Sequence, residues 1–201
     1  MAINLANNNS LANITALPSS ISGGAMTLLS TQTASSSATL SFTSGIDDTY
    51  DSYVFKFIDI NVSDFMVNFN FNLSTDGGSN YNVTKTTTSF SSYHTEDNTG
   101  AALAYKTSHD LAQSTSDQRF NVNSGVGNGA DETLCGTMIL YNPSSTTFVK
   151  HFILNIPFHG SASSLNSFVA GYGNTTSAVN AIIFKTASGT FDGVIKLYGV
   201  S

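Results

Sequence analysis

The sequence predicts an all-β fold: an antiparallel β-sandwich or jelly roll with an extended N-terminal arm. Two observations lead to this prediction. First, apolar and polar residues alternate in many short segments, most clearly over residues 67–73, where Val, Phe, Phe and Leu alternate with three Asn residues. A period of two is typical of a strand with one apolar face. Second, no segment offers three helical turns of good helix formers with an apolar stripe.

Residues 1–24 form the predicted arm. Their apolar residues are dotted among small polar ones without a sustained period of 2 or 3.6, and Pro18 and the pair Gly23-Gly24 punctuate the end. Such a segment has too little apolar area for a core of its own. We therefore expect it to dock on the body of the protein or on a neighbouring subunit. The expected partner-binding residues are Ile3, Leu5, Leu11, Ile14, Leu17 and Ile21.

Residues 25–201 form the predicted β-sandwich domain, and the chain length suits a single domain of this class. β-Branched and aromatic residues dominate its expected strands, as a pleated, half-buried surface favours. About eleven strands with almost no helix indicate a sandwich or jelly roll. The expected strands are 26–33, 38–43, 53–60, 67–73, 83–93, 120–123, 133–141, 148–156, 167–172, 178–186 and 193–200.

Turn residues separate these strands. The segment 76–80, Asp-Gly-Gly-Ser-Asn, supplies positive φ without steric cost and is expected to close a hairpin between strands 67–73 and 83–93. The longest gap between strands runs over 94–118. It contains Ala-Ala-Leu-Ala-Tyr at 101–105, which is a candidate for one short helix.

Charged residues are scarce and acidic residues outnumber basic ones. They make up 10% of the chain, with 7 Lys and Arg against 13 Asp and Glu, for a net charge of −6. The basic residues are scattered singly, whereas nucleic-acid binding requires them in clusters. We expect no nucleic-acid partner and no attraction to an anionic membrane surface. The longest mainly apolar run, 152–158, is far shorter than the roughly 20 residues of a membrane span. Residues 1–10 contain no Lys or Arg, so we expect no secretory signal there.

No motif specifies catalysis, so we expect no enzyme activity and name no catalytic residue. The chain lacks a GxSxG elbow. Its neighbouring carboxylates, Glu96-Asp97 and Asp131-Glu132, lie in polar segments where such groups are usually just solvated. A hydrolase is the least supported of three functional hypotheses, because only the abundance of Ser and these acidic pairs favour it. The other two hypotheses are given below.

No cofactor or metal is expected either. The four His residues lack the spacing of zinc ligands. Calcium is the stronger alternative, with oxygens from Asp47, Asp48 and Asp51 or from Asp76, but Asx turns explain these residues more simply. The single Cys135 excludes an internal disulfide, and its position in the apolar run 134–140 predicts a buried small hydrophobic residue.

Six segments carry a resemblance to a known group of proteins. They are MAINLANNNSLANITALPSSISGGAMTLLSTQTASSS, YDSYVFKFIDIN, LSTDGGSNYNVTKTTT, NPSSTTFVKHF, FVAGYGNTTSAVNAIIFK and GVIKLYGVS. These segments look like a group of virion structural proteins of tailed phages from marine bacteria. The resemblance implies a homo-oligomeric head-decoration or tail-appendage subunit that is assembled in the host cytoplasm, contacts other capsid or tail proteins and resides in the virion.

The alternative hypothesis is a glycan- or receptor-binding β-sandwich at the tip of a fibre. Eight Tyr residues are available to stack on sugar rings, although Trp is absent. The irregular segments 94–118 and 124–131 provide candidate loops for a host-surface glycan. The two hypotheses are compatible, since an appendage subunit can also bind a receptor.

Overall fold

The computed structural model describes residues 26–121, 125–160 and 162–201. All regular secondary structure in these ranges is β-strand, so none of the described segments is a helix capable of crossing a membrane. The predicted arm, residues 1–24 with its six expected partner-binding residues, lies outside the described residues, and its docking role stays a prediction.

Twelve strands form two antiparallel sheets that pack as a sandwich, which confirms the predicted fold class. The strands are β1 (Thr27–Ser37), β2 (Thr39–Phe42), β3 (Ser52–Val62), β4 (Phe69–Ser74), β5 (Lys85–Thr95), β6 (Ala101–Tyr105), β7 (Gln118–Arg119), β8 (Leu134–Tyr141), β9 (Lys150–His159), β10 (Ser163–Gly173), β11 (Ala181–Thr186) and β12 (Phe191–Val200).

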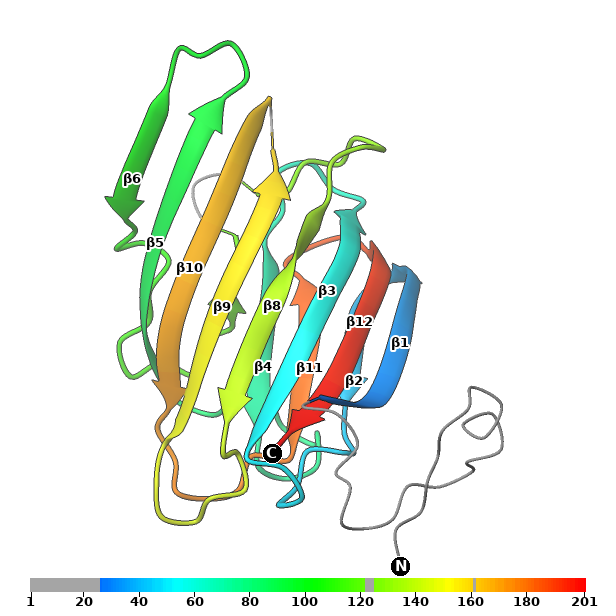
Figure 1. Cartoon of the computed structure of the whole chain (residues 1–201), viewed down its shortest axis with the longest axis vertical. Helices are drawn as coiled ribbons and strands as arrows, with labels where there is room; N and C mark the ends of the chain where they lie inside the picture. The colour runs from blue at the N-terminus through cyan, green and yellow to red at the C-terminus, as the bar shows by residue number, and fades with distance from the viewer. Residues whose placement is uncertain (1–25, 122–124, 161) are drawn as a thin grey trace, which may run out of the picture.

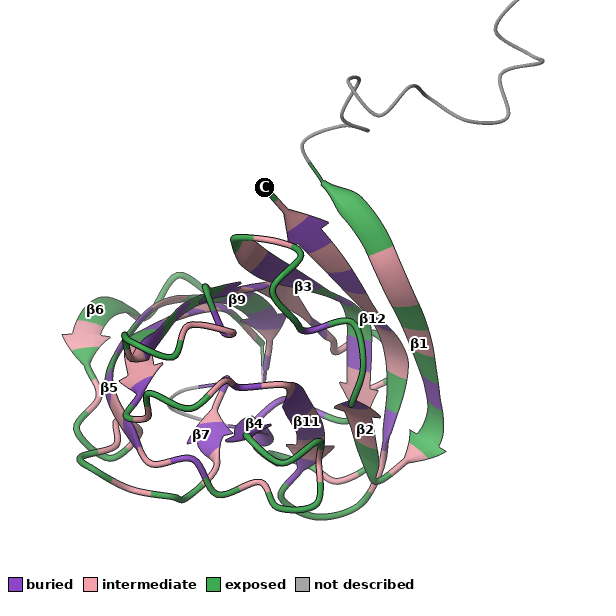
Figure 2. Ribbon diagram, turned by 90° about the horizontal axis from the view of Figure 1, so that it is seen from below, coloured by how far each residue is buried: buried purple, intermediate pink, exposed green. Residues whose placement is uncertain are grey.

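The two sheets differ in size. The large sheet has the order β1-β12-β3-β8-β9-β10-β5-β6, and the small sheet has the order β2-β11-β4-β7 (Figure 1). Seen along the strands, the large sheet curves around the small one, which lies against its concave side (Figure 2). The convex side of the large sheet is therefore left without a covering layer among the described residues, and β1 and β6 form its two edges.

Aromatic side chains fill the space between the sheets. The ring of Phe57 on β3 lies edge-to-face against Phe69, Phe120 and Phe184, with centroid distances of 6.3, 4.8 and 5.1 Å. All four side chains are buried. Edge-to-face pairs of this kind contribute about 0.5–1.5 kcal/mol each beyond the area that they bury. They join both sheets in one core, which holds a chain that has no disulfide.

Three predictions of local structure are wrong. Segment 76–80 is a turn, with Gly77 and Gly78 at φ of 72° and 91°, but it leads from β4 in the small sheet to β5 in the large sheet and closes no hairpin. Residues 101–105 form strand β6, because they complete a hairpin along the free edge of β5. Pairing with β5 outweighs the helix preference of the three Ala residues. Of the strand expected at 120–123, residues 120 and 121 are not in a strand and residues 122 and 123 lie outside the described residues. The chain pairs with β4 at Gln118–Arg119 instead.

The prediction of a buried Cys135 is also wrong, and strand parity explains why. Leu134, Met138 and Leu140 on β8 face the core, so the odd-numbered residues of this strand face outward. Cys135 is half-buried there. Its Sγ accepts a hydrogen bond from the backbone N–H of Asp59 at 3.4 Å, beside the irregular register between β3 and β8.

Candidate functional site

The outward-facing side of β8, β9, β10, β5 and β6 is the candidate site, and we call it the outer face. Strand parity defines it. On β9, Phe152, Leu154 and Ile156 are buried in the core, whereas the residues between them are exposed. The same alternation continues on β10 and β5, so five neighbouring strands present one continuous surface (Figure 1).

The outer face carries no formal charge. The five strands contain no Asp, Glu or Arg, and their two lysines, Lys85 and Lys150, are fully buried. Proteins commonly use charged side chains to prevent an exposed sheet from associating with other molecules. Their absence here leaves a surface that a partner can cover without desolvating an ion.

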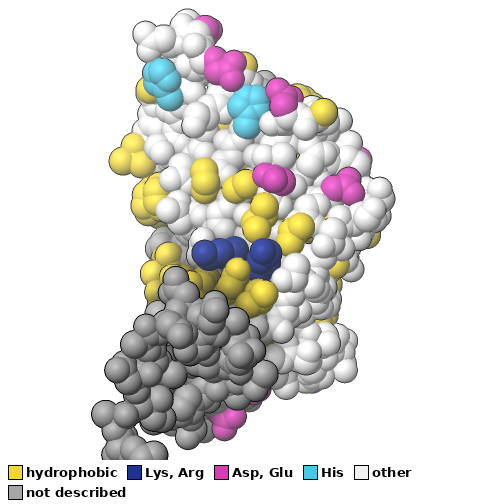
Figure 3. Space-filling view, turned by 45° about the vertical axis from the view of Figure 1, so that its right-hand side comes forward, with side chains coloured by type: hydrophobic (Ala, Val, Ile, Leu, Met, Phe, Trp, Pro, Cys, Tyr) yellow, Lys and Arg dark blue, Asp and Glu magenta, His cyan; other side chains and the backbone are white. Residues whose placement is uncertain are grey.

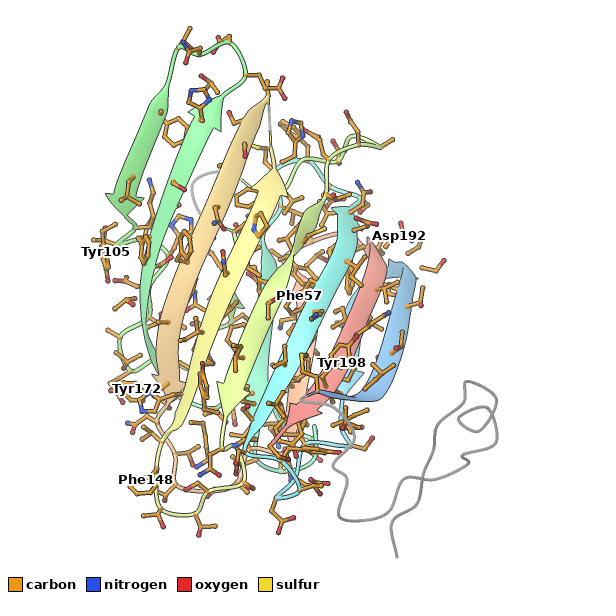
Figure 4. All side chains as sticks on the ribbon, viewed as in Figure 1. Phe57, Tyr105, Phe148, Tyr172, Asp192 and Tyr198 are labelled. Atoms are coloured by element: carbon orange, nitrogen blue, oxygen red, sulfur yellow. The ribbon has the colours of Figure 1, made fainter. Side chains whose placement is uncertain are left out.

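Large apolar side chains are exposed on the outer face. Leu103, Tyr105, Ile153 and Phe90 have exposed fractions of 71, 53, 47 and 41%. Phe90 stacks on Phe168 of the neighbouring strand, with ring centroids 4.9 Å apart and an interplanar angle of 13°. Figure 4 shows Tyr105 at the β6 edge and Tyr172 near one end of β10.

Strand β5 has the reverse of the usual polarity. Its inward-facing residues Lys85, Thr87, Ser89 and Ser91 are polar, whereas the apolar Phe90 faces outward. Thr87 makes a typical interior contact, in which its hydroxyl donates to Oε1 of Gln118 at 2.7 Å. Burial in the core therefore does not explain why β5 carries Phe90. A contact made on the outer face explains this residue better.

A shallow hollow of about 440 Å³ lies at one end of the outer face. Tyr141, His151 and Tyr172 line it from three adjacent strands, together with hydroxyl groups from Thr86 and Thr88. The His151 and Tyr172 rings are 6.0 Å apart, at 61° to each other. Flat rings beside hydroxyl groups suit the apolar face and the hydroxyl rim of a sugar.

The rest of the large sheet differs, because it carries charge. Lys56 on β3 and Lys196 on β12 are directly paired in register, and Nζ of Lys56 lies 5.6 Å from the centroid of the Tyr198 ring. Figure 3 shows the Lys and Arg side chains on this side of the molecule gathered in one small cluster among hydrophobic ones. The uncharged surface thus ends at β8.

Two of the predicted loop carboxylates meet at a histidine. Nε2 of His159 lies 3.2 Å from Oε1 of Glu96, and Nδ1 lies 3.7 Å from Oε1 of Glu132. His159 and Cys135 both border a second hollow, of about 280 Å³. The sequence did not indicate that Glu96, Glu132 and His159 meet, since they are more than 25 positions apart. Nevertheless, no described group of three or more His, Cys, Asp and Glu side chains is arranged to hold a metal ion.

The candidate calcium residues make local turns instead. Oδ1 of Asp47 accepts hydrogen bonds from the Thr49 N–H and the Tyr53 hydroxyl, both at 2.9 Å. Hydrogen bonds from Asn80 and from Ser74 lower the pKa of Asp76 from 3.8 to about 2. Both residues therefore fit the simpler interpretation, in which a carboxylate organises its own turn.

No protein-family model, curated protein or solved structure matches this chain. The argument about function therefore depends on the outer face and on the residues of the chain itself.

Proposed function

We propose that this chain is a structural subunit of a tailed-phage virion, a capsid-decoration or tail-appendage protein that works by packing against other subunits. The observation that carries the proposal is the outer face, where five neighbouring strands expose aromatic and aliphatic side chains without a formal charge. Soluble monomers scatter their exposed apolar residues, whereas a face that gathers several large apolar side chains and exposes no charged one is typical of an interaction site. The resemblance to virion structural proteins supports the same assignment.

Charge distribution favours association between identical copies. The five strands of the outer face expose no Asp, Glu, Lys or Arg, and the carboxylates of Asp110, Glu96 and Glu132 meet Tyr105 and His159 at its borders. Two copies can therefore meet over most of this face with little like-charge repulsion. Contacts of this kind also depend little on salt, because Ser, Thr, Asn and Tyr side chains carry no charge near neutral pH. A homo-oligomer assembled through this surface fits a particle that must persist in changing surroundings.

The two edge strands provide further contact sites. β1 and β6 contain no Lys, Arg, Asp, Glu or Pro, which are the residues that usually protect exposed edges from pairing. β6 borders the outer face, and β1 follows the predicted arm in the chain. We assign contacts between copies to the β6 side and anchoring on another virion protein to the arm and β1.

Mass spectrometry and cryo-electron microscopy of purified particles test this proposal. The expected result is that the chain is present in many copies, with β8, β9, β10, β5 and β6 facing a neighbouring subunit. Particles that lack the chain, or that contain it with the outer face open to solvent, would refute the proposal.

A second candidate function is glycan binding in the hollow of the outer face. The observation that favours it is the group of Tyr141, His151 and Tyr172 beside two threonine hydroxyls. A glycan array tests it, with Tyr172→Ala as the variant. The matched control is Tyr198→Ala on β12, in the charged part of the large sheet. Binding that is lost only in Tyr172→Ala supports this function, and absence of binding by the unmodified protein at high concentration refutes it.

A further inference from the structure

The two buried lysines have different surroundings. Nζ of Lys150 donates to the carbonyl oxygens of Ser145, Phe148 and Thr175, at 2.6, 2.6 and 3.2 Å. Three backbone carbonyls form a complete set of acceptors for one ammonium group. Nζ of Lys85 instead meets a side-chain amide: it lies 2.5 Å from Oδ1 of Asn72 and 2.8 Å from the carbonyl oxygen of Val83.

Lys85 and Asn72 come from different sheets and are both shielded from water. Lys85 begins β5 in the large sheet and Asn72 lies in β4 of the small sheet. Lys85 is fully buried and Asn72 is only 2% exposed. Burial of the ammonium group lowers the pKa of Lys85 from 10.5 to about 8, despite the opposing effect of Asp117 nearby. At a pKa of about 8, roughly a tenth of the Lys85 side chains are the neutral, nucleophilic amine at pH 7.

The amide of Asn72 is held in a reactive arrangement. Because a C=O bond is about 1.2 Å long, the 2.5 Å contact puts Nζ of Lys85 within about 3.7 Å of Cγ of Asn72, close to the separation of about 3–3.5 Å in a near-attack geometry. Oδ1 of Asn72 also accepts the backbone N–H of Leu73 at 2.9 Å. This backbone donor can stabilise the negative charge that develops on Oδ1 when Nζ leaves its hydrogen bond and attacks the carbonyl carbon.

The third member of the group is Asp117, just before β7. Nδ2 of Asn72 donates to Oδ1 of Asp117 at 3.0 Å and to the carbonyl oxygen of Thr115, also at 3.0 Å. Oδ2 of Asp117 is held by Nζ of Lys185 at 2.8 Å. A carboxylate is thus fixed against the nitrogen that would leave the amide, where a proton must arrive.

We propose that Lys85 and Asn72 join in an intramolecular isopeptide bond, formed by the folded protein itself with Asp117 as the catalytic residue. Neutral Nζ attacks Cγ of Asn72 and forms the new C–N bond. Once this bond has brought Nζ beside Nδ2, Asp117 takes one proton from Nζ and delivers it to Nδ2. The bond between Cγ and Nδ2 then breaks and ammonia leaves. Amine and primary amide become secondary amide and ammonia, so the step needs no oxidant, metal or other reactant.

The bond would link β4 of the small sheet directly to β5 of the large sheet. The chain has no disulfide to do this, since Cys135 is its single cysteine. A covalent link inside the sandwich suits a protein that is loaded mechanically, and it does not require a reducing or oxidising compartment. This inference is independent of the proposed virion role, because it concerns only residues within one chain.

Intact mass spectrometry of the purified, full-length protein tests the proposal. The expected mass is about 17 Da below that of the sequence, which corresponds to one ammonia. Trypsin cannot cleave after an acylated lysine, so digestion of the denatured protein should yield residues 57–106 as one fragment that carries this loss. The full sequence mass, or normal cleavage after Lys85, would overturn the proposal, because a loss of ammonia at another site leaves Lys85 cleavable.

Matched variants assign the chemistry. Lys85→Arg keeps the charge and a trypsin site but is not nucleophilic, so it should show the full mass and cleavage at position 85. Lys150→Arg is the control at the other buried lysine and should keep the loss of about 17 Da. Asp117→Ala should form the bond at a rate at least about 10²-fold lower. Loss of the bond in Lys150→Arg, or an unchanged rate in Asp117→Ala, would contradict the assigned roles. If Lys85→Arg does not fold, the unmodified protein alone decides.

Discussion

Ile153 and Leu154 are neighbours on β9 that face opposite sides of the large sheet, so they separate assembly from folding. Leu154 is fully buried in the core, whereas Ile153 is 47% exposed on the outer face. Leu154→Ala removes buried methyl groups and leaves a cavity, so we expect it to lower the free energy of unfolding by about 2–5 kcal/mol. Ile153→Lys puts a charge on a half-exposed site, so we expect a stability change below about 1 kcal/mol.

The effects on association should be the reverse. A lysine at position 153 puts an ion in the middle of the uncharged outer face, where a partner would have to desolvate it. We therefore expect Ile153→Lys to dissociate oligomers in sedimentation velocity and to reduce incorporation into particles, whereas Leu154→Ala associates normally under conditions where it is folded. Urea denaturation followed by circular dichroism measures the stability of both.

Two results would refute this reasoning. If Ile153→Lys destabilises the protein as much as Leu154→Ala, the outer face is part of a core. If Ile153→Lys leaves both the oligomer size and the incorporation unchanged, the outer face is not the contact surface. A suitable control is Phe148→Ala in the exposed loop between β8 and β9 (Figure 4), which should change neither quantity.

Three further predictions concern the arm, a buried lysine and a turn. Deletion of residues 2–22 removes no described strand and should leave a folded β domain that no longer enters particles; loss of the circular dichroism signal of β-structure would show that the arm belongs to the core. Lys150→Met leaves three carbonyls without their donor and should lower the free energy of unfolding by about 3 kcal/mol in urea denaturation, and an unchanged midpoint would contradict this. The folded-state pKa of Asp76, about 2, is below the ordinary value of 3.8, so its contribution to stability is present above pH 3.8 and is lost as the pH falls through 2. An NMR titration of its carboxyl carbon should have its midpoint near 2, and a midpoint near 3.8 would contradict the hydrogen bonding described here.

The outer face and the Lys85–Asn72 pair describe two separate needs of an assembly subunit. The outer face provides contact between molecules, and the internal bond would keep each molecule from opening when it is pulled through those contacts. The two inferences have separate tests, since one is measured by association and the other by mass. Either can fail while the other holds.

Local sequence patterns predicted most of the strands. Ten of the eleven expected segments overlap a strand of the structure, because alternation of apolar and polar residues is a property of neighbouring positions and reports directly on a half-buried strand. The exception is 120–123, of which the described residues 120 and 121 follow the two-residue strand β7. That strand is too short to show a period. Strand β6 was missed because its sequence, AALAY, does not alternate.

The polar contacts that define the candidate sites could not be predicted. The Asn at position 72 was assigned to the polar face of a strand, but that face is buried and meets Lys85 and Asp117. The outer face was also missed, because alternation shows that two faces differ without showing which one is covered. The two faces are distinguished only by the tertiary structure, in which no described element covers the convex side of the large sheet.

The sequence by itself determined that this protein is an all-β sandwich with few charges and no recognisable catalytic motif. The tertiary structure alone decided that residues 69–74 and 85–95 enter different sheets, that 101–105 forms an edge, and that Lys85 contacts Asn72. The physical reason is the separation in sequence between the residues that interact. Side-chain alternation and composition are set by residues near one another in the chain, whereas strand order depends on pairing between segments far apart, and the close approach of two side chains depends on that order.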